Sequence, residues 1–340
     1  MEMKEAKQHN LDPDDVRFFS GTSNPDLAMR IADFLNIPLE KAHFSRFSND
    51  NLFVQLGASV RGRVVYIVQS LTPPVSDHLF ELLMMLDIAK SAGAREVHAI
   101  IPYFSYARSD KKDAPRISIT ARLVADLLVT AGATHIMTMR LHSAQVHGFF
   151  SVPADPVTAR TLQANYVREK GLNTEDSVVV APDIGNAKSS ARFADMLGIP
   201  VATAIKTRVS DTKVRIDDML QRQIAGFKHA IFHDDEIATG GTVVELCNVL
   251  VECGIERITV VCTHGLFLGA AIERLGSIPQ IREIITTDTV AHSPERLSLP
   301  NFTVLSTAPV FGGAIRQNYI RESIGDLFTF WPDEVETVNN

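Results

Sequence analysis

The 340-residue sequence predicts an α/β protein made of two similar units, each with a mainly parallel central sheet flanked by helices. Short apolar runs of strand length alternate with amphipathic stretches along almost the whole chain, which is typical of strand–helix–strand units. The alternation recurs in the second half of the sequence. A chain of this length also has room for about two domains.

In the first half, Val64–Val68 is a short apolar run bounded by Gly62 and by a proline turn, so it is expected to form a buried strand. Apolar side chains at helical spacing predict a helix over residues 77–91, which Gly93 ends. Residues 97–101 form the next predicted strand. A strand, a crossover helix and a second strand in this order predict a parallel sheet.

The second half repeats this order. Residues 229–232 are predicted as a strand, residues 242–253 as a helix, and residues 258–262 as the next strand. The helix-to-strand junctions are also alike, with GAREV at 93–97 and GIERI at 254–258. An internal duplication of one α/β unit explains this similarity. The proline-bearing stretch near residues 153–160 is the expected boundary between the two copies.

Composition excludes several classes of protein. The chain has 33 Lys and Arg against 40 Asp and Glu, and this net charge of −7 provides no basic face for nucleic acid. Its three cysteines lack a CxxC spacing, which argues against disulfides or a zinc site and favours a reducing compartment. Residues 1–15 are polar and read as a flexible tail, and no apolar run is long enough for a membrane span. We therefore expect a cytoplasmic protein with neither nucleic acid nor membrane as a partner.

The strongest chemical signal follows the strand predicted at 229–232. Asp234 and Asp235, called the acid pair below, precede a loop of small residues that opens a helix. The members of this small-residue loop are Ala238, Thr239, Gly240, Gly241 and Thr242. Backbone N–H groups of such a loop bind phosphate, and two adjacent carboxylates accept hydrogen bonds from a sugar diol. The combination predicts a ribose 5-phosphate site, and the alternative is a solvated acidic turn that caps a helix.

At this motif the chain resembles the phosphoribosyltransferase superfamily, and further segments narrow the resemblance to the ribose-phosphate diphosphokinase (phosphoribosyl pyrophosphate synthetase) family. The resemblance is nearly colinear from about residue 17 to residue 328. The segments that carry it are FFSGTS at 18–23, RFSN at 46–49, SVRG at 59–62, VYIVQS at 65–70, PYFSYAR at 102–108, DKKD at 110–113, LH at 141–142, GFF at 148–150, APD at 181–183 and THG at 263–265.

The resemblance implies two tandem phosphoribosyltransferase-like domains and the transfer of the diphosphoryl group of Mg-ATP to the C1 hydroxyl of ribose 5-phosphate. The N-terminal domain, residues 16–157, would lie on the ATP side and would be completed by the C-terminal segment 308–332. The second domain, residues 158–307, would bind ribose 5-phosphate. The implied assembly is a homo-oligomer, a hexamer built from dimers, in which neighbouring subunits share the ATP site.

The resemblance also assigns roles to residues. The acid pair would hold the ribose hydroxyls, residues 238–242 the 5-phosphate, and residues 183–188 would form a loop near the diphosphate. Lys206 and Arg208 match the pair that stabilises the transferring group, and side chains two apart on an extended segment point to the same side. The residues assigned to ATP are Arg108, Asp110, Lys111, Asp113 and His142, together with Phe47, Asn49 and Asn51, which would reach the adenine bound by a neighbouring subunit.

The implied cofactor is Mg²⁺, and the candidate metal residues are His142, Asp155 and Asp183. Two departures from the family bear on this site, because Arg140 and Ser151 stand where acids are usual. At 4 Å and an effective dielectric constant of about 20, one unit charge acting on another is worth roughly 4 kcal/mol, so Arg140 is not a neutral replacement. Either Arg140 contacts phosphate oxygens directly or the site no longer performs the reaction.

Three hypotheses follow. The chain is an active ribose-phosphate diphosphokinase with altered metal handling, or a catalytically silent regulatory paralogue that joins a homologous partner subunit, or a related enzyme with a different sugar phosphate or donor. AMP formation that depends on ribose 5-phosphate would mark the first. Co-purification with a homologous subunit would mark the second, and turnover of another substrate would mark the third.

Overall fold

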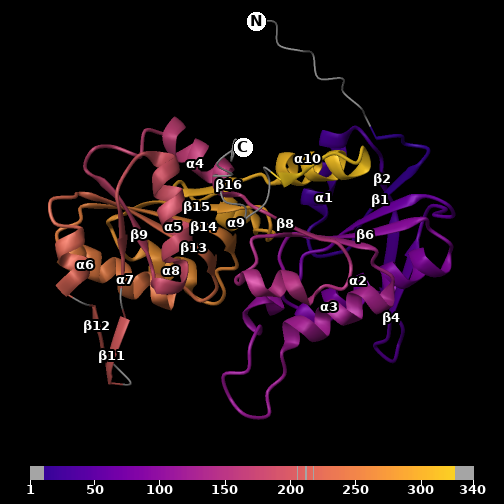
Figure 1. Ribbon diagram of the computed structural model, residues 1–340, viewed down its shortest axis with the longest axis horizontal. Helices are drawn as coiled ribbons and strands as arrows, with labels where there is room; N and C mark the ends of the chain where they lie inside the picture. The colour runs from indigo at the N-terminus through magenta and orange to yellow at the C-terminus, as the bar shows by residue number, and fades with distance from the viewer. Residues whose placement is uncertain (1–10, 205, 211–212, 217, 326–340) are drawn as a thin grey trace, which may run out of the picture. The chain divides into compact units, whose positions relative to one another are not determined.

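The computed structural model describes residues 11–204 and 219–325, and the backbone alone of residues 206–210, 213–216 and 218. The chain forms two compact units (Figure 1). Unit 1 contains the described residues up to Thr158 and those from Thr307 onward, and unit 2 contains Ala159–Ser306. Within the described part of the chain, no helix has the length and apolar character needed to span a membrane.

The centre of unit 1 is a six-stranded parallel sheet with the strand order β2-β1-β5-β6-β7-β8. A separate antiparallel hairpin, β3–β4, follows the second strand along the chain. The elements of unit 1 are β1 (Val16–Ser20), α1 (Pro25–Leu35), β2 (Leu39–Glu40), β3 (Ala42–Arg46), β4 (Leu52–Leu56), β5 (Val64–Val68), α2 (Val75–Ser91), β6 (Glu96–Ile101), the 3-10 helix η1 (Ser105–Arg108), α3 (Thr120–Ala131), β7 (His135–Met139), the 3-10 helix η2 (Ala144–Phe149), β8 (Ala154–Val157) and α10 (Ala308–Tyr319).

Two pairs of helices cover the faces of the unit 1 sheet (Figure 1). Leu82 of α2 and Leu128 of α3 pack on one face against strand residues such as Ile67. The other face carries α1 and α10, which are far apart in the sequence but lie side by side, with the Arg316 guanidinium 5.1 Å from the centre of the Phe34 ring. The C-terminal helix therefore completes the N-terminal unit.

Unit 2 repeats the topology of unit 1. Its six-stranded parallel sheet has the order β10-β9-β13-β14-β15-β16, and an antiparallel hairpin, β11–β12, again follows the second strand. The elements of unit 2 are α4 (Arg160–Glu169), β9 (Ser177–Ala181), α5 (Ile184–Leu197), β10 (Val201–Thr203), β11 (Lys206–Ser210), β12 (Lys213–Ile216), α6 (Asp218–Gln223), β13 (His229–Ile237), α7 (Gly241–Glu252), β14 (Arg257–Gly265), α8 (Ala271–Gly276), β15 (Ile281–Thr287), α9 (Pro294–Leu297) and β16 (Phe302–Leu305).

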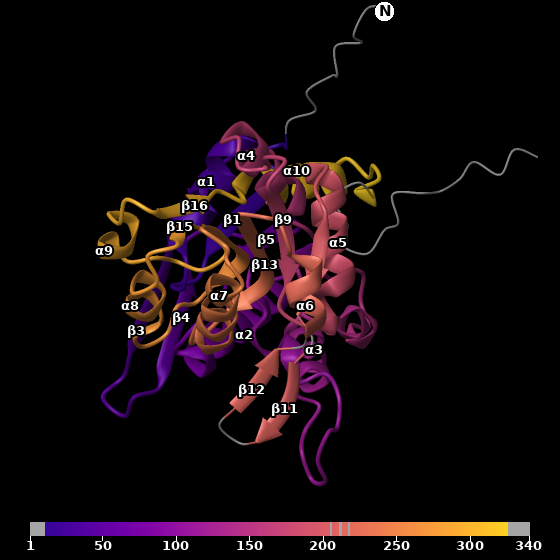
Figure 2. The same ribbon diagram turned by 90° about the vertical axis from the view of Figure 1, so that its left-hand side faces the viewer.

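The helices of unit 2 also lie on both faces of its sheet. Phe193 of α5 packs with Ile231 on one face, and Leu246 of α7 packs with Phe232 on the other. The chain therefore leaves the adjacent strands β9 and β13 toward opposite faces, which opens a crevice at their carboxyl ends. In Figure 2 the β11–β12 hairpin projects from the rest of unit 2.

The structure confirms the predicted α/β class with parallel sheets, and the equal strand orders agree with an internal duplication. One strand is longer than predicted. Instead of ending at Phe232, β13 continues to Ile237, because it stays paired with β14 through Asp234–Cys262 and Ile237–Gly265. The acid pair therefore lies on a strand rather than in a loop.

The N-terminal segment differs from the expected tail. Leu11 is only 2% exposed, and the Asp15 carboxylate accepts hydrogen bonds from Arg95, at 2.7 and 2.8 Å, and from the hydroxyl of Tyr319 at 3.2 Å. Residues 11–15 are thus held against unit 1 by an apolar contact and an ion pair. Residues 1–10 lie outside the described part of the chain.

Candidate active site

The acid pair occupies the carboxyl end of β13, beside the crevice in the unit 2 sheet. Asp235 is buried, Asp234 is half-buried, and the Asp235 backbone N–H donates to Asp234 Oδ1 at 2.8 Å. Burial, and then the neighbouring Asp235 carboxylate, raise the pKa of Asp234 well above its usual value, and Asp183 adds to the effect. This concentration of negative charge suits a ligand that brings hydroxyl donors or a cation.

Helix α5 closes the other side of the crevice. The Asp183 carboxylate caps this helix by accepting the Asn186 N–H at 2.9 Å. The Asn186 side chain donates to the His233 carbonyl at 2.8 Å and lies 3.4 Å from Asp234 Oδ1. Asn186 therefore ties the two strand ends of the crevice together. The stretch 183–188, expected as a loop, is instead the cap and first turn of α5, and this role of Asn186 was missed from the sequence.

The small-residue loop joins the acid pair to α7. Gly240 is the N-cap and has φ of +74°, a left-handed conformation that a residue with a side chain adopts only at a cost. Gly241 begins the helix, and open space surrounds the position of a Cβ on it. Thr239 and Thr242 are exposed. Because the first N–H groups of a helix have no partner within it, the loop forms a cradle for an anion.

The predicted catalytic pair lies on the β11–β12 hairpin. The backbone of Lys206 is paired with Ile216, and that of Arg208 with Val214, so both residues occupy one extended strand. Their side chains lie outside the described part of the structure. Their role in stabilising the transferring group stays a prediction.

In unit 1, the residues assigned to adenine lie at the tip of the β3–β4 hairpin. The tip is closed by a hydrogen bond from the Phe47 N–H to the Asn51 carbonyl at 2.9 Å, and the Asn49 side chain accepts the Asn51 N–H at 3.3 Å. Arg46 binds Asp77 of α2 at 2.7 Å, which fixes the hairpin to the helix. The Phe47 side chain is 57% exposed, so the tip presents an aromatic ring to solvent.

The other residues assigned to ATP follow the carboxyl ends of the adjacent strands β6 and β7. After β6, Arg108 ends the 3-10 helix η1, and the exposed loop beyond it contains Asp110, Lys111 and Asp113. After β7 comes Arg140, whose φ is +42°, followed by the exposed His142. The topology therefore brings these two segments to one edge of the unit 1 sheet.

Within unit 1, the predicted metal residues Asp155 and His142 lie at different places along the sheet. Asp155 lies on β8 opposite Met137 and binds His135 Nε2 at 2.6 Å, whereas His142 follows the far end of β7. At about 3.3 Å per residue, the strand itself separates them. Asp183 belongs to unit 2, and Ser151 is exposed in the loop before β8. Among the described residues, no group of three or more His, Cys, Asp or Glu side chains is arranged to hold a metal ion.

The equivalent crevice in unit 1, between β1 and β5, is filled by the chain's own side chains. Gln69 follows β5, and its amide accepts the Ser23 hydroxyl at 2.7 Å and donates to Glu81 at 2.8 Å. Glu81 also accepts the Thr22 hydroxyl at 2.7 Å. A Cβ on Gly21 would lie 2.3 Å from the Gln69 side chain, so the packing leaves no room for a ligand. Among the described residues of unit 2, the acid pair and Asn186 flank the corresponding crevice instead.

Two family models match the chain. The family model for the N-terminal domain of ribose phosphate pyrophosphokinase matches residues 16–132, and the model for the phosphoribosyl synthetase-associated domain matches residues 220–329. Pyrophosphokinase and diphosphokinase are two names for one activity.

Relatives cover nearly the whole chain. A protein from Streptomyces coelicolor is 47% identical over 318 residues, which cover 94% of this chain and 99% of the relative. The ribose-phosphate pyrophosphokinase of Deinococcus radiodurans is 42% identical over 313 residues, or 92% of this chain and 97% of the relative. The crystal structure of phosphoribosylpyrophosphate synthetase from Mycobacterium smegmatis superposes with a TM-score of 0.83 at 36% identity, covering 90% of this chain and 99% of that one. The chain therefore belongs to the ribose-phosphate pyrophosphokinase family.

Proposed function

We propose that the chain transfers the diphosphoryl group of ATP to the C1 hydroxyl of ribose 5-phosphate. The C1 oxygen bonds to the β-phosphorus of ATP, the bond from that phosphorus to the α–β bridging oxygen breaks, and AMP leaves with the bridging oxygen. The observation that carries this proposal is the acid pair beside the anion cradle at the open crevice of unit 2. A sugar-phosphate site could serve several reactions, and membership of the ribose-phosphate pyrophosphokinase family favours this one.

Ribose 5-phosphate fits the charge pattern of this site. Hydroxyl groups of the sugar donate to Asp234 and Asp235, which reduces the repulsion that raises the pKa of Asp234. The 5-phosphate accepts hydrogen bonds from the N–H groups at Gly240 and Gly241 and interacts favourably with the N-terminus of α7. Together these contacts hold the sugar at both ends. The site thereby fixes the position of the C1 hydroxyl before it reacts.

We assign unit 2 to ribose 5-phosphate and unit 1 to ATP. The unit 1 residues assigned to ATP are exposed at the hairpin tip and in the loops after β6 and β7. An exposed Phe47 on a hairpin fixed by Arg46 is suited to stack on an adenine held by another chain. We therefore propose a homo-oligomer, with dimers and a hexamer as the family assembly, that shares the ATP site between subunits.

Transfer of a diphosphoryl group places negative charge on the equatorial oxygens, so positioned cations supply much of the catalysis. We propose that Lys206 and Arg208, on the projecting hairpin, provide two of these cations, and that Arg108 and Lys111 hold the phosphates of ATP.

The residues present fit a Mg²⁺ ion that arrives with ATP. Mg²⁺ is usually bound by one or two carboxylates together with substrate phosphates rather than by a complete protein cage. An exposed carboxylate, Asp183, at the crevice of unit 2 suits that mode, and the exposed His142 is a separate candidate in unit 1. When bound, the ion would neutralise charge on the transferring group. Arg140, half-buried at the same edge of unit 1 as His142, would bind phosphate oxygens directly.

One observation favours a second candidate. In that case the chain is either a catalytically silent subunit that regulates a homologous partner, or an enzyme that uses a different sugar phosphate or donor. Arg140 and Ser151 replace acids expected near the metal, and no described cluster substitutes for them. We also propose a reducing, cytoplasmic location, which the unpaired state of Cys247, Cys253 and Cys262 supports.

The test is to incubate the purified chain with Mg-ATP and ribose 5-phosphate and to follow the reaction by phosphorus NMR. Equal formation of AMP and phosphoribosyl diphosphate is expected. Neither product, at high Mg²⁺ and with inorganic phosphate present, would reject the proposal for the isolated chain. A matched reaction without ribose 5-phosphate controls for simple ATP hydrolysis. Co-purified homologous subunits and other sugar phosphates would then be examined.

A further inference from the structure

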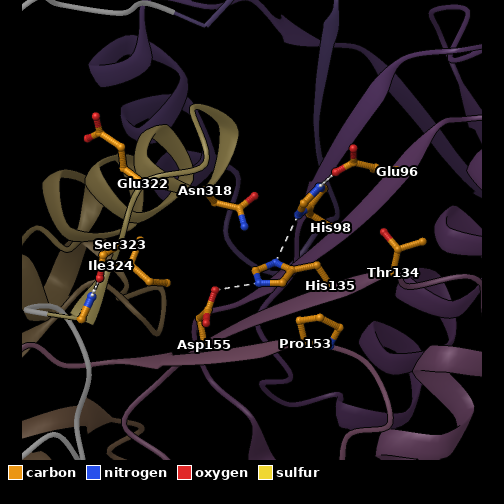
Figure 3. Close-up of a pocket in the computed structure, with 11 residues that line it drawn as sticks. Glu96, His98, Thr134, His135, Pro153, Asp155, Asn318, Glu322, Ser323 and Ile324 are labelled. Carbon is orange, nitrogen blue, oxygen red and sulfur yellow. Dashed lines mark hydrogen bonds and ion pairs between the residues drawn. The ribbon is translucent and has the colours of Figure 1, made fainter.

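A row of aromatic side chains crosses the face of the unit 1 sheet that α10 covers. Strand register places Tyr66 of β5 beside His98 of β6, and His98 beside His135 of β7. The Tyr66 and His98 rings stack with centroids 4.5 Å apart, and the two imidazoles follow at 5.0 Å. Both histidines, called the histidine pair below, are over 90% buried and line a cavity of about 790 Å³ (Figure 3). Asn318 at the end of α10 lines the same cavity.

The histidine pair is held between two carboxylates. His135 Nε2 lies 2.6 Å from Asp155 Oδ2, and His98 Nε2 lies 3.2 Å from Glu96 Oε2. The two remaining ring nitrogens, both Nδ1, face each other at 3.1 Å. The chain of four groups thus has three close contacts, and all of them can be followed in Figure 3.

The number of protons does not match these contacts. A neutral imidazole carries one N–H, so the pair supplies two protons for three contacts. If each Nε2–H donates to its carboxylate, the two Nδ1 lone pairs point at each other across 3.1 Å. If one Nδ1–H instead donates to the other Nδ1, the Nε2 of that histidine faces its carboxylate without a proton. A cation bound by both Nδ1 atoms removes this mismatch.

The surroundings favour a metal ion in this place. Glu96, Asp155 and Glu322 line the cavity, and none of its described lining residues is Lys or Arg. Ligands bound at 2.0–2.1 Å and separated by 3.1 Å subtend an angle of roughly 100° at the ion, between octahedral and tetrahedral values. A metal-binding histidine usually donates its other N–H to a carboxylate, and both members of the pair have that partner.

We infer that His98 and His135 bind a transition-metal ion, Zn²⁺ in the first place, through their Nδ1 atoms, with the remaining coordination positions open to the cavity. Paired imidazoles select such ions over Mg²⁺, which prefers oxygen ligands. The site lies on the amino-terminal halves of β6 and β7, whereas the residues assigned to ATP follow their carboxyl ends. It is therefore distinct from the Mg²⁺ of the proposed reaction and does not depend on that proposal.

Calorimetric titration of the full chain with Zn²⁺, in a large excess of Mg²⁺, tests the inference. Wild-type protein is expected to bind one Zn²⁺ that His98→Gln no longer binds, while His43→Gln, which changes an exposed histidine on the β3–β4 hairpin, keeps it. Asp155→Asn removes the acceptor that orients His135 and is expected to lower the affinity about 10- to 100-fold. Equal Zn²⁺ binding by wild type and His98→Gln, or no binding by wild type, would overturn the inference.

A second measurement does not depend on how the variants fold. Electron paramagnetic resonance of wild-type protein with one equivalent of Cu²⁺ is expected to show coupling to two imidazole nitrogens. Because the site also faces Asn318 and Ser323, bound Zn²⁺ is expected to slow amide exchange in residues 318–325. Coupling to one nitrogen or none would reject the histidine pair as the ligand.

Discussion

Gly241→Ala separates the folding role of the small-residue loop from its proposed role in binding. Gly241 is the first residue of α7, its φ lies outside the left-handed region, and the position of its Cβ is surrounded by open space. Alanine therefore fits the folded protein without strain. A helical Cβ points toward the N-terminus of the helix, which is where the 5-phosphate is proposed to bind.

The two effects of Gly241→Ala have opposite signs. Replacing a glycine by alanine at a compatible position reduces the entropy of the unfolded chain and stabilises the fold by about 0.4–1 kcal/mol. For a unit of this size the rise in Tm is about 1–4 °C. A methyl group that displaces the phosphate costs at least one hydrogen bond to a charged group, about 1.5–3 kcal/mol. Because 1.4 kcal/mol is tenfold, the KM for ribose 5-phosphate should rise about 10- to 150-fold.

The assay measures AMP formation against the concentration of ribose 5-phosphate, with Tm determined in parallel. Gly240→Ala is the matched control: its Cβ would contact Ala271 at an ordinary 3.5 Å, but its φ of +74° imposes a cost of about 1–2 kcal/mol. That variant should lose stability, unlike Gly241→Ala. If Gly241→Ala raises Tm and leaves KM unchanged, the loop does not bind the phosphate and the reasoning fails.

Three further predictions concern the acid pair, the hairpin and the metal. Because its neighbours and its burial raise the pKa of Asp234, this carboxyl favours folding most at low pH and loses that contribution as pH rises through its folded pKa. Asp234→Asn should then abolish activity yet raise the free energy of unfolding at neutral pH by about 0.5–2 kcal/mol, and this gain should disappear in acid. Urea titrations at several pH values measure it. A gain that does not depend on pH would contradict the raised pKa of Asp234 as its cause. Arg46→Ala, which releases the hairpin from Asp77, should raise the KM for ATP several-fold without changing Tm. Arg46→Lys should have an intermediate KM. An unchanged KM would show that the hairpin tip does not bind the nucleotide. The double change Arg140→Asp and Ser151→Asp should lower the Mg²⁺ concentration needed for half-maximal AMP formation, and an unaltered Mg²⁺ dependence would place the ion elsewhere.

Much of the fold could be predicted because its strands are buried on both faces. Val64–Val68 is apolar throughout, and the structure has a fully buried β5 with those bounds. The end of β13 could not be predicted in the same way, since Asp234 and Asp235 are polar and only the backbone pairing with β14 keeps them in the strand. Side-chain polarity predicts burial, but it does not report which backbone groups find a partner in the next strand.

The candidate site was predictable where one continuous segment carries it. The acid pair and residues 238–242 could be identified from their spacing along the sequence alone. The structure joins them as the end of a strand, a loop and the start of a helix. Asn186 was missed because its contact with Asp234 crosses between two strands that are far apart in the sequence. Asp155 was placed with His142 in the sequence prediction, yet Asp155 lies within β8 opposite Met137, whereas His142 follows the carboxyl end of β7, a separation that only strand register reveals.

The duplicated topology explains why we place the proposed sugar site in only one of the two units. Both sheets have the same strand order, and the first residues of the paired strands are matched in the same way, Val16 with Val64 in unit 1 and Ser177 with His229 in unit 2. Counted from Val64 in unit 1 and from His229 in unit 2, the sixth residue is Gln69 in the first case and Asp234 in the second. Gln69 completes an internal network that fills its crevice, whereas the Asp234 carboxylate faces a repulsive neighbour that a ligand relieves. Equivalent positions thus lead to a packed core in unit 1 and to the acid pair in unit 2, where we propose that ribose 5-phosphate binds; in that proposal unit 1 acts through its hairpin and its loops.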